Sequence, residues 1–102
     1  MYKLIITKDA QHELDEIDNY ITLQLCNPEA ALDFLQDLAE CYQNLAEHPY
    51  MYQASNDAHL KAKGYRKAVI KNYILLYKVD DVAETVTIYG VFYGPSEYYN
   101  LL

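Results

Sequence analysis

The side chains that could bind an anion gather in one short segment of this 102-residue chain. Five basic residues follow one another there with no acidic residue between them: Lys61, Lys63, Arg66, Lys67 and Lys71. Arg66 is the only arginine, and its planar guanidinium can bind a phosphate or a carboxylate through two parallel hydrogen bonds. We expect any contact with an anionic partner to lie in this segment. The same lysines could equally be a solvated strand edge, and Arg66 could equally belong to a structural ion pair.

A group that could transfer protons is harder to find. The three histidines lie in different predicted elements, at spacings that match no metal site: His12, His48 and His59. We therefore expect neither a metal nor a cofactor. Tyr93, where the last predicted strand ends, could serve as an acid–base group or could simply pack at the rim of the core. Arg66 and Tyr93 are thus weak catalytic candidates, and Tyr98 joins the basic segment as a candidate for target or anion binding.

The charge of the chain is distributed unevenly. The formal net charge is -7, yet residues 1–60 hold two lysines against eleven acidic residues, and residues 61–102 hold six basic against four acidic residues. Nonspecific binding to nucleic acid depends on many clustered cations, so this balance argues against it. Cys26 and Cys41, both on predicted helices, form no Cys-x-x-Cys motif, which is typical of reduced thiols. No apolar run approaches the roughly 18 residues of a membrane span, and the first residues predict a strand rather than a signal peptide. We expect no membrane contact and a cytoplasmic location.

Two helices precede the basic segment in the hydrophobic pattern. Residues 2–7 are rich in strand-forming residue types, which predicts a first strand. Thr7 or Asp9 can then cap a helix whose apolar side chains recur every three or four positions: Ala10, Leu14, Ile17, Ile21 and Leu25. Residues 27–29, Asn-Pro-Glu, suit the cap and first turn of a second helix, which Pro49 ends. Because the connection is short, the two helices should form an antiparallel hairpin.

The rest of the chain predicts a loop and then three strands. Residues 49–62 sustain no period and indicate a loop, with Tyr50 and Tyr52 as partial anchors. From Gly64 the period is two, and the nearly apolar run at residues 73–79 should be a central strand. The last predicted strand also has a period of two, with its residues alternating between two faces. Val86, Ile88, Gly90 and Phe92 belong to one face, and Thr85, Thr87, Tyr89 and Val91 belong to the other. Gly94-Pro95-Ser96 should stop this strand, and residues 97–102 have the composition of one further helical turn.

The predicted fold is α+β, in the order β-α-α-β-β-β, with a short C-terminal helix as an option. A small sheet, made of the first strand and a three-stranded antiparallel meander, is covered on one face by the two-helix hairpin. Residues 1–102 are expected to form a single domain.

In this arrangement the chain resembles the RelE/ParE toxin superfamily of bacterial type II toxin–antitoxin modules, and its ParE-like members more closely. The matching pieces span nearly the whole chain: residues 2–10 with Leu14 and Ile17, residues 27–31 with Phe34, the helix end at residues 45–49, and Tyr65, Arg66 and Lys67 through Tyr73 and Tyr77. ParE-like members tend to end the last strand with His-Gly and then Arg-Arg-Asp, where this chain has Tyr93-Gly94-Pro95-Ser96. Only Lys61, Lys63 and Arg66 could then stand in for the family's positive side chains.

The resemblance implies a toxin that binds a cognate antitoxin protein, and it leaves three alternatives for its activity. A ParE-like toxin would inhibit DNA gyrase and would not be an enzyme. A RelE-like toxin would be a ribosome-dependent mRNA endoribonuclease, which the acidic charge and the missing arginines argue against. The third alternative is an antitoxin-binding protein that keeps the fold without toxicity. Apolar anchors should dominate antitoxin binding, with a weak dependence on salt. The sequence leaves open whether the chain forms a homodimer.

Overall fold

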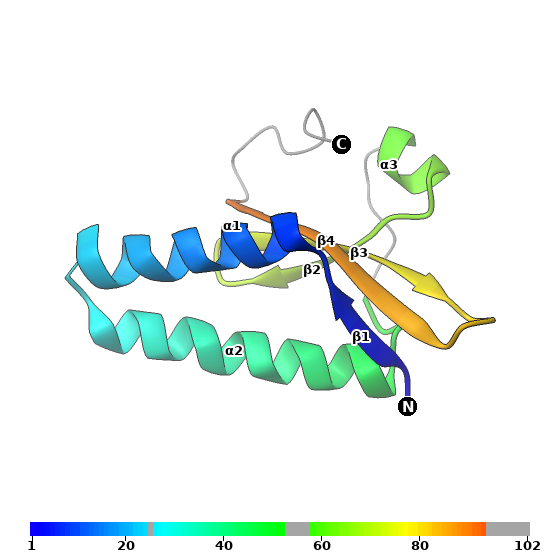
Figure 1. Cartoon of the computed structure of the whole chain (residues 1–102), viewed down its shortest axis with the longest axis horizontal. Helices are drawn as coiled ribbons and strands as arrows, with labels where there is room; N and C mark the ends of the chain where they lie inside the picture. Colours follow the sequence, from blue (N-terminus) through cyan, green and yellow to red (C-terminus); the bar gives the residue numbers. More distant parts are fainter. Residues whose placement is uncertain (25, 53–57, 94–102) are drawn as a thin grey trace.

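Two long helices lie side by side on one face of a four-stranded sheet (Figure 1). The computed structural model describes residues 1–24, 26–52 and 58–93. Its elements follow one another along the chain as β1 (Lys3–Ile6), α1 (Lys8–Asn19), the π-helical turn η1 (Tyr20–Gln24), α2 (Pro28–Glu47), α3 (Ala58–Ala62), β2 (Arg66–Ile70), β3 (Tyr73–Asp80) and β4 (Thr85–Tyr93). The predicted α+β fold and its order β-α-α-β-β-β are confirmed. The expected stop at residues 94–96 and the helical turn at 97–102 lie outside the described residues.

The sheet is mixed, with the strands in the order β1-β4-β3-β2. β2, β3 and β4 form the predicted antiparallel meander, and β1 pairs in parallel with β4 from Lys3↔Thr85 to Ile6↔Ile88. Parallel neighbours cannot be joined by a tight turn, so the helices and the meander lie between them in the chain. β3 lies between β2 and β4, as its almost wholly apolar sequence predicts for a central strand.

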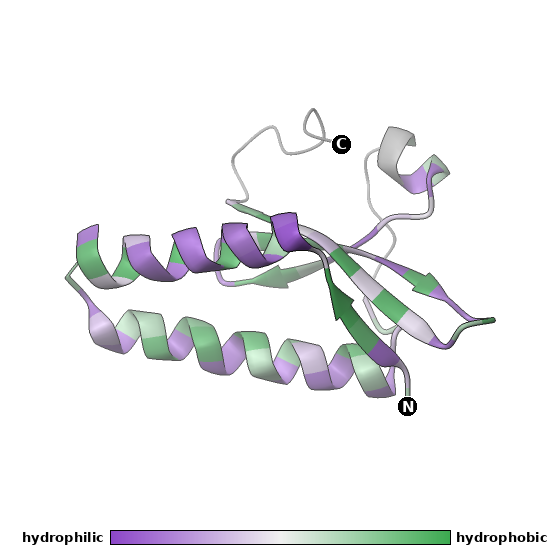
Figure 2. Cartoon of the chain, viewed as in Figure 1, coloured by the Kyte–Doolittle hydropathy of each residue, from purple (hydrophilic) through white to green (hydrophobic). Residues whose placement is uncertain are grey.

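Both long helices begin at the predicted caps. Thr7 Oγ1 accepts a hydrogen bond from the backbone N–H of Ala10 at 3.1 Å, and Asn27 Oδ1 accepts one from that of Ala30, also at 3.1 Å. Each bond satisfies an N–H that has no partner within its own helix. Cys26 is in the connection rather than on a helix as expected, and its φ of 49° there reverses the chain direction. Figure 2 shows mainly hydrophilic residues along α1 and hydrophobic ones in β1, as a covering helix and a half-buried strand require.

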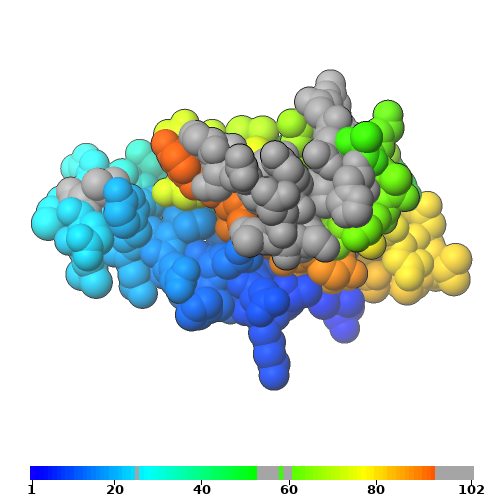
Figure 3. Space-filling view, turned by 90° about the horizontal axis from the view of Figure 1, so that it is seen from above, coloured from blue at the N-terminus to red at the C-terminus, as the bar shows by residue number. Residues whose placement is uncertain are grey.

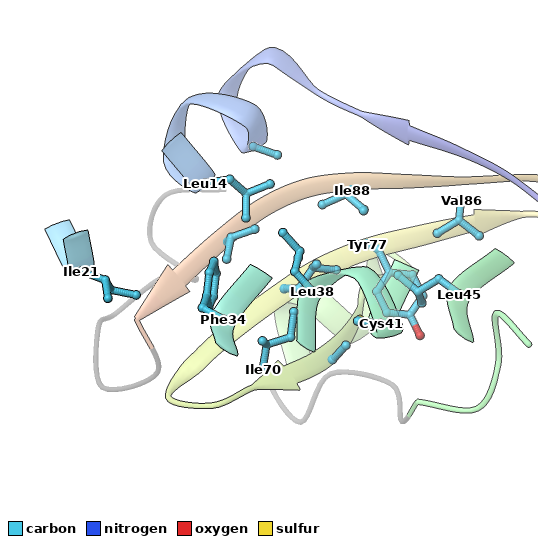
Figure 4. Close-up of a cluster of buried hydrophobic side chains, with 14 of the residues drawn as sticks. Leu14, Ile21, Phe34, Leu38, Cys41, Leu45, Ile70, Tyr77, Val86 and Ile88 are labelled. Atoms are coloured by element: carbon cyan, nitrogen blue, oxygen red, sulfur yellow. The ribbon is translucent and has the colours of Figure 1, made fainter. Parts of the chain in front are cut away.

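The core lies between the helix hairpin and the sheet (Figure 4). Among its most buried side chains are Phe34 and Leu45 from α2, Leu75 and Tyr77 from β3, and Val86 and Ile88 from β4. Burying each apolar side chain of this size contributes about 1.5–3 kcal/mol before the entropy of ordering is counted. The ring of Phe34 meets that of Tyr73 edge-on at 5.3 Å between centroids. The buried hydroxyl of Tyr77 donates to the backbone oxygen of Pro49 at 3.1 Å, which ties the chain after α2 to the sheet.

A bulge in β4 changes which side chains face the helices. Leu76 is opposite Gly90 and Tyr77 opposite Ile88, so Tyr89 has no partner on β3. The unbroken alternation predicted for this strand is therefore wrong beyond residue 88: Val91 packs in the core under the helices, and Phe92 packs in a second cluster with Tyr65 and Leu76. A Cβ at Gly90 would lie 2.5 Å from the Phe92 ring, so any larger residue at this position would displace that ring.

The segment predicted as a loop at residues 49–62 contains one element that was not expected. Residues 58–62 form the short helix α3, whose five residues are too few to show a helical period in the sequence. The expected anchoring of the loop by tyrosines is confirmed. Tyr50 donates a hydrogen bond to Asp81, and the Tyr52 hydroxyl accepts one from Asn44.

Candidate functional site

Arg66, the strongest single candidate for anion binding, is engaged with its own chain. It is the first residue of β2, and its Nη1 donates a hydrogen bond to the backbone oxygen of Tyr52 at 2.7 Å. The guanidinium carbon also lies 4.8 Å from the centroid of the Tyr50 ring, within the range of a cation–π contact. Arg66 therefore holds the chain after α2 against the edge of the sheet. Within the described residues its partners are a carbonyl and an aromatic ring rather than the structural ion pair considered for it.

A carboxylate extends this network to the opposite edge of the sheet. Asp81, in the turn between β3 and β4, accepts hydrogen bonds of 2.6 Å from the hydroxyls of Tyr2 and Tyr50. These two bonds favour the ionised carboxylate and hold the pKa of Asp81 below its usual value. The hydrogen bond to Asp81 likewise raises the pKa of Tyr2 to about 12 and raises that of Tyr50. We name Tyr2, Tyr50, Arg66 and Asp81 the clamp, since together they join the start of the chain, the residues after α2 and two strands.

The four lysines of the basic segment do not share one surface element. Lys61 is in α3, Lys63 is in the turn after it, Lys67 is on β2, and Lys71 is in the turn between β2 and β3. The alternative that these lysines form one solvated strand edge is therefore wrong for all of them except Lys67. Lys71 Nζ lies 3.3 Å from Asp37 Oδ2 of α2, an exposed ion pair of a kind that contributes little to stability.

A sixth basic residue, Lys78, was not among the sequence candidates and lies against two aromatic rings. Lys78 Nζ lies 4.4 Å from the ring centroid of Tyr65 and 5.6 Å from that of Tyr89. The two rings meet edge-on at 5.6 Å. The sequence could have indicated the face on which this contact lies. Side chains alternate along β3, so Lys78 is on the same face as Leu76, away from the helices.

Tyr93 borders a groove at the far end of β4. Its side chain is 50% exposed and its ring meets that of Tyr73 edge-on at 5.8 Å. The groove has a volume of about 540 Å³, and one wall belongs to α1 and the other to the strand ends. Its lining is Glu13, Glu16, Ile17, Tyr20, Tyr73, Val91, Phe92 and Tyr93. Figure 3 shows α1, in blue, beside the orange end of β4.

Glu13 is the polar group that sequence reasoning missed in this groove. Its Oε1 accepts a hydrogen bond from the backbone N–H of Val91 at 3.4 Å, and burial raises the pKa of its carboxyl above the usual value. The sequence had shown it only as one of several acids on α1. The position of β4 beside this helix, which distinguishes Glu13 from its neighbours, follows from the tertiary packing.

The structure does not bring the two catalytic candidates together. Arg66 is opposite Tyr77 on one side of β3, whereas Tyr93 is opposite Tyr73 on the other side, four residues earlier in that strand. At about 3.3 Å per residue and about 4.8 Å per strand, their backbones are about 16 Å apart. Their side chains also have different partners, since Arg66 contacts Tyr50 and Tyr52 and Tyr93 contacts Tyr73. Tyr98 lies outside the described residues.

In the described parts of the chain, no three His, Cys, Asp or Glu side chains are placed to hold a metal ion, and His12 pairs with Glu16 at 2.8 Å. Across the same residues, no helix combines the length and the hydropathy of a bilayer-spanning segment.

Comparisons with known proteins agree on the fold. Residues 4–98 match the family model described as the ParE toxin of the type II toxin–antitoxin system, parDE. The chain is similar to a chain of the chromosomal ParDE toxin–antitoxin system of P. aeruginosa, with 22% identity, a TM-score of 0.66 and coverage of 91% of this chain and 96% of that one. It is also similar to a chain of the toxin–antitoxin complex RelBE2 of Mycobacterium tuberculosis, with 20% identity, a TM-score of 0.63 and coverage of 90% and 96%. A search of curated proteins found no match.

Proposed function

We propose that this chain, which belongs to the family of ParE toxins of type II toxin–antitoxin systems, inhibits DNA gyrase in the cytoplasm and is neutralised by a cognate antitoxin protein. The observation that supports this choice most strongly is the family match, which extends from the first strand beyond the last one. The solved structures similar to it include members of both a ParDE and a RelBE module, so their fold does not discriminate between the two activities.

The position of Arg66 supports gyrase inhibition over RNA cleavage. A ribonuclease of the RelE type needs cations that hold the scissile phosphate beside a group that activates the ribose hydroxyl. The only arginine of the chain is bound to the Tyr52 carbonyl and the Tyr50 ring, and about 16 Å separates it from Tyr93. Releasing Arg66 for a phosphate would leave that carbonyl without its charged donor, at a cost of about 1–3 kcal/mol.

A second candidate function, ribosome-dependent cleavage of mRNA, is favoured by one observation. Lys61 and Lys63 are exposed, and neither makes an ion pair within the described residues. They are available to contact phosphates, although two lysines on a chain with a net charge of -7 provide little long-range attraction.

The test compares the two activities with the same purified protein. We expect it to inhibit supercoiling of relaxed plasmid by gyrase and to leave mRNA intact in a ribosome-containing extract. RNA cleavage in that extract, without an effect on gyrase, would support the second candidate instead. Harmless expression without the antitoxin, together with neither activity in vitro, would indicate a binding protein that has lost toxicity.

Charge-reversal variants make the comparison sharper. The double variant Lys61→Glu with Lys63→Glu should leave gyrase inhibition within about twofold of the unmodified chain, because we assign no target contact to these lysines. The matched control is Lys3→Glu with Lys8→Glu, which makes the same change of net charge at exposed positions of β1 and α1. If only the first pair abolishes activity, an anionic target binds at α3 and the proposal must be revised.

A further inference from the structure

Three tyrosines give the groove between α1 and the end of β4 an aromatic wall: Tyr20, Tyr73 and Tyr93. The ring of Tyr73 is held by two edge-on contacts, with Phe34 at 5.3 Å and with Tyr93 at 5.8 Å between centroids. Tyr20 and Tyr93 are each about half-exposed. Rings that packing already holds lose little freedom when a ligand binds, and the negative faces of such rings attract a cation.

The hydroxyls of these tyrosines are close enough to interact electrostatically. Burial raises the pKa of Tyr73, and the neighbouring Tyr20 and Tyr93 raise it further. The Tyr73 hydroxyl is therefore neutral at ordinary pH, and its oxygen can accept a hydrogen bond from a ligand. The aromatic wall thus offers hydrogen-bond acceptors together with apolar area.

Two carboxylates belong to the α1 side of the groove, those of Glu13 and Glu16. Glu13 Oε1 accepts a hydrogen bond from Val91 N–H at 3.4 Å, and the other oxygen has no partner within the described residues. Burial is the largest cause that raises the pKa of Glu13, so its ionised form is poorly solvated there. Within the described residues the partner of Glu16 is His12, at 2.8 Å. A cation that entered the groove would replace part of the solvation that the Glu13 carboxylate has lost.

The spacing and charge of this wall indicate the class of ligand. Glu13 and Glu16 are three positions apart in one helix, which makes them neighbours with about 5–6 Å between their Cβ atoms. Among the described lining residues none is a lysine or an arginine, and α1 as a whole has five acidic residues and one lysine. A ligand with two ammonium groups joined by a short alkyl chain matches this pattern, because its ends can meet the carboxylates and its methylene groups can pack on the rings. At about 540 Å³ the groove is within the usual size of a small-molecule site.

We propose that the groove between α1 and the end of β4 binds a small aliphatic polyamine, with ammonium groups at Glu13 and Glu16 and methylene groups against the rings of Tyr20, Tyr73 and Tyr93. An anion would be repelled by the two carboxylates, and a neutral apolar molecule would leave them uncompensated. The assignment does not rest on the proposed function, because the charge and lining of the groove alone define the ligand.

Titration of the isotope-labelled chain with spermidine, followed by NMR, tests the site directly. We expect saturable shifts of the Val91 amide and of the Tyr20 and Tyr73 ring resonances, while the amide of Lys67 on β2 stays unshifted. Magnesium chloride is the control for a general counterion, because Mg²⁺ is a cation without methylene groups. Equal shifts with Mg²⁺ would identify an adventitious ion only and would overturn the proposal. So would binding of a lysine-containing peptide without any binding of spermidine, because the groove would then take a side chain of a partner protein.

Replacement of Glu13 tests the charge on the α1 side. Glu13→Gln keeps an acceptor for Val91 N–H and removes the carboxylate, so spermidine should bind about fivefold more weakly. The matched control is Asp33→Asn, which removes one negative charge from an exposed position of α2 and should change the affinity by less than about twofold. Equal effects of the two variants would show that only the overall charge attracts the ligand and would refute the contact.

Two substitutions of Tyr20 separate the ring from its hydroxyl. Tyr20→Phe keeps the ring, so the affinity for spermidine should stay within about twofold of that of the unmodified chain. Tyr20→Leu keeps an apolar side chain without a π system, and spermidine should bind about fivefold more weakly. Because Tyr20 is half-exposed, both variants should fold, which circular dichroism checks. If folded Tyr20→Leu binds spermidine as tightly as Tyr20→Phe, the aromatic wall does not contact the ligand and the proposed site is refuted.

Discussion

Replacing Arg66 by alanine should destabilise the fold without removing a catalytic group. The change deletes a hydrogen bond from a charged donor to the Tyr52 carbonyl and a cation–π contact with Tyr50. A bond of the first kind contributes about 1.5–3 kcal/mol and a partly exposed contact of the second kind about 0.5–1 kcal/mol. Because Arg66 is half-buried and water can replace part of the bond, we expect a loss of about 2 kcal/mol in the free energy of unfolding. For a domain of this size that lowers Tm by about 8–16 °C.

The assay is urea unfolding followed by circular dichroism, with variants that separate the two contacts. Arg66→Lys keeps the charge but loses the planar group, so it should recover only part of the stability. Lys67→Ala is the matched control, since it removes a cation from the next position of β2, and its effect should stay within about 0.5 kcal/mol. A double-mutant cycle of Arg66→Ala with Tyr50→Ala should give a coupling energy of about 0.5–1 kcal/mol.

Activity measured at a temperature where both variants are folded decides the role of Arg66. Gyrase inhibition by Arg66→Ala should then equal that of the unmodified chain. The reasoning would be refuted if Arg66→Ala were as stable as Lys67→Ala, since the contacts to Tyr50 and Tyr52 would then contribute nothing. It would also be refuted if the folded variant lost all activity, because the guanidinium would then have to reach the target.

Two further predictions concern the tyrosines and the clamp. Tyr77→Phe should lower the free energy of unfolding by about 1–2 kcal/mol, because it leaves the buried oxygen of Pro49 without its donor. Tyr42→Phe should be neutral or stabilising, because the buried Tyr42 hydroxyl has no hydrogen-bond partner in the described structure. Thermal unfolding of the two variants checks this, and an equal loss of stability in both would contradict it. The lowered pKa of Asp81 means that its contribution is present above the pKa of the unfolded chain, about 3.9, and is lost as the pH falls through the lower folded value. The raised pKa of Tyr2, about 12, has the opposite consequence: its contribution is present below the unfolded value near 10 and is lost as the pH rises from 10 towards 12. The stability difference between the unmodified chain and Asp81→Asn should therefore be constant between about pH 5 and 9 and shrink at both extremes, and a difference that does not vary with pH would exclude the clamp.

The fold could be predicted from the sequence because its signals are local. The caps at Thr7 and Asn27 and the apolar periods of α1 and α2 depend on residues a few positions apart. The bulge at Tyr89 was missed for a different reason. It is a shift of register between β3 and β4, and an isolated glycine in an alternating strand predicts a bulge only weakly.

The candidate site could be predicted only in part, because charge in a sequence does not show what each cation contacts. The basic segment reads as a free surface, yet Arg66 lies over the Tyr50 ring and Lys71 pairs with Asp37. These partners are 16 and 34 positions away in the chain, so only the folded arrangement joins them. Glu13 shows the opposite problem. It is one of several acidic residues on α1, and only its hydrogen bond with Val91 at the end of β4 distinguishes it from the others.

The way the cations are used has a consequence for how this chain binds any partner. Of the six basic residues after position 60, Arg66, Lys71 and Lys78 are engaged with aromatic rings, a carbonyl or an acid of the same chain. A target or antitoxin recognised mainly through its negative charge would meet only a few scattered lysines on an acidic protein. Affinity must therefore come mainly from contacts that do not depend on charge, and among the described residues the groove between α1 and the end of β4 provides apolar and aromatic side chains for them. Complex formation that weakens only slightly with added salt follows from this view, and a steep dependence on salt would contradict it.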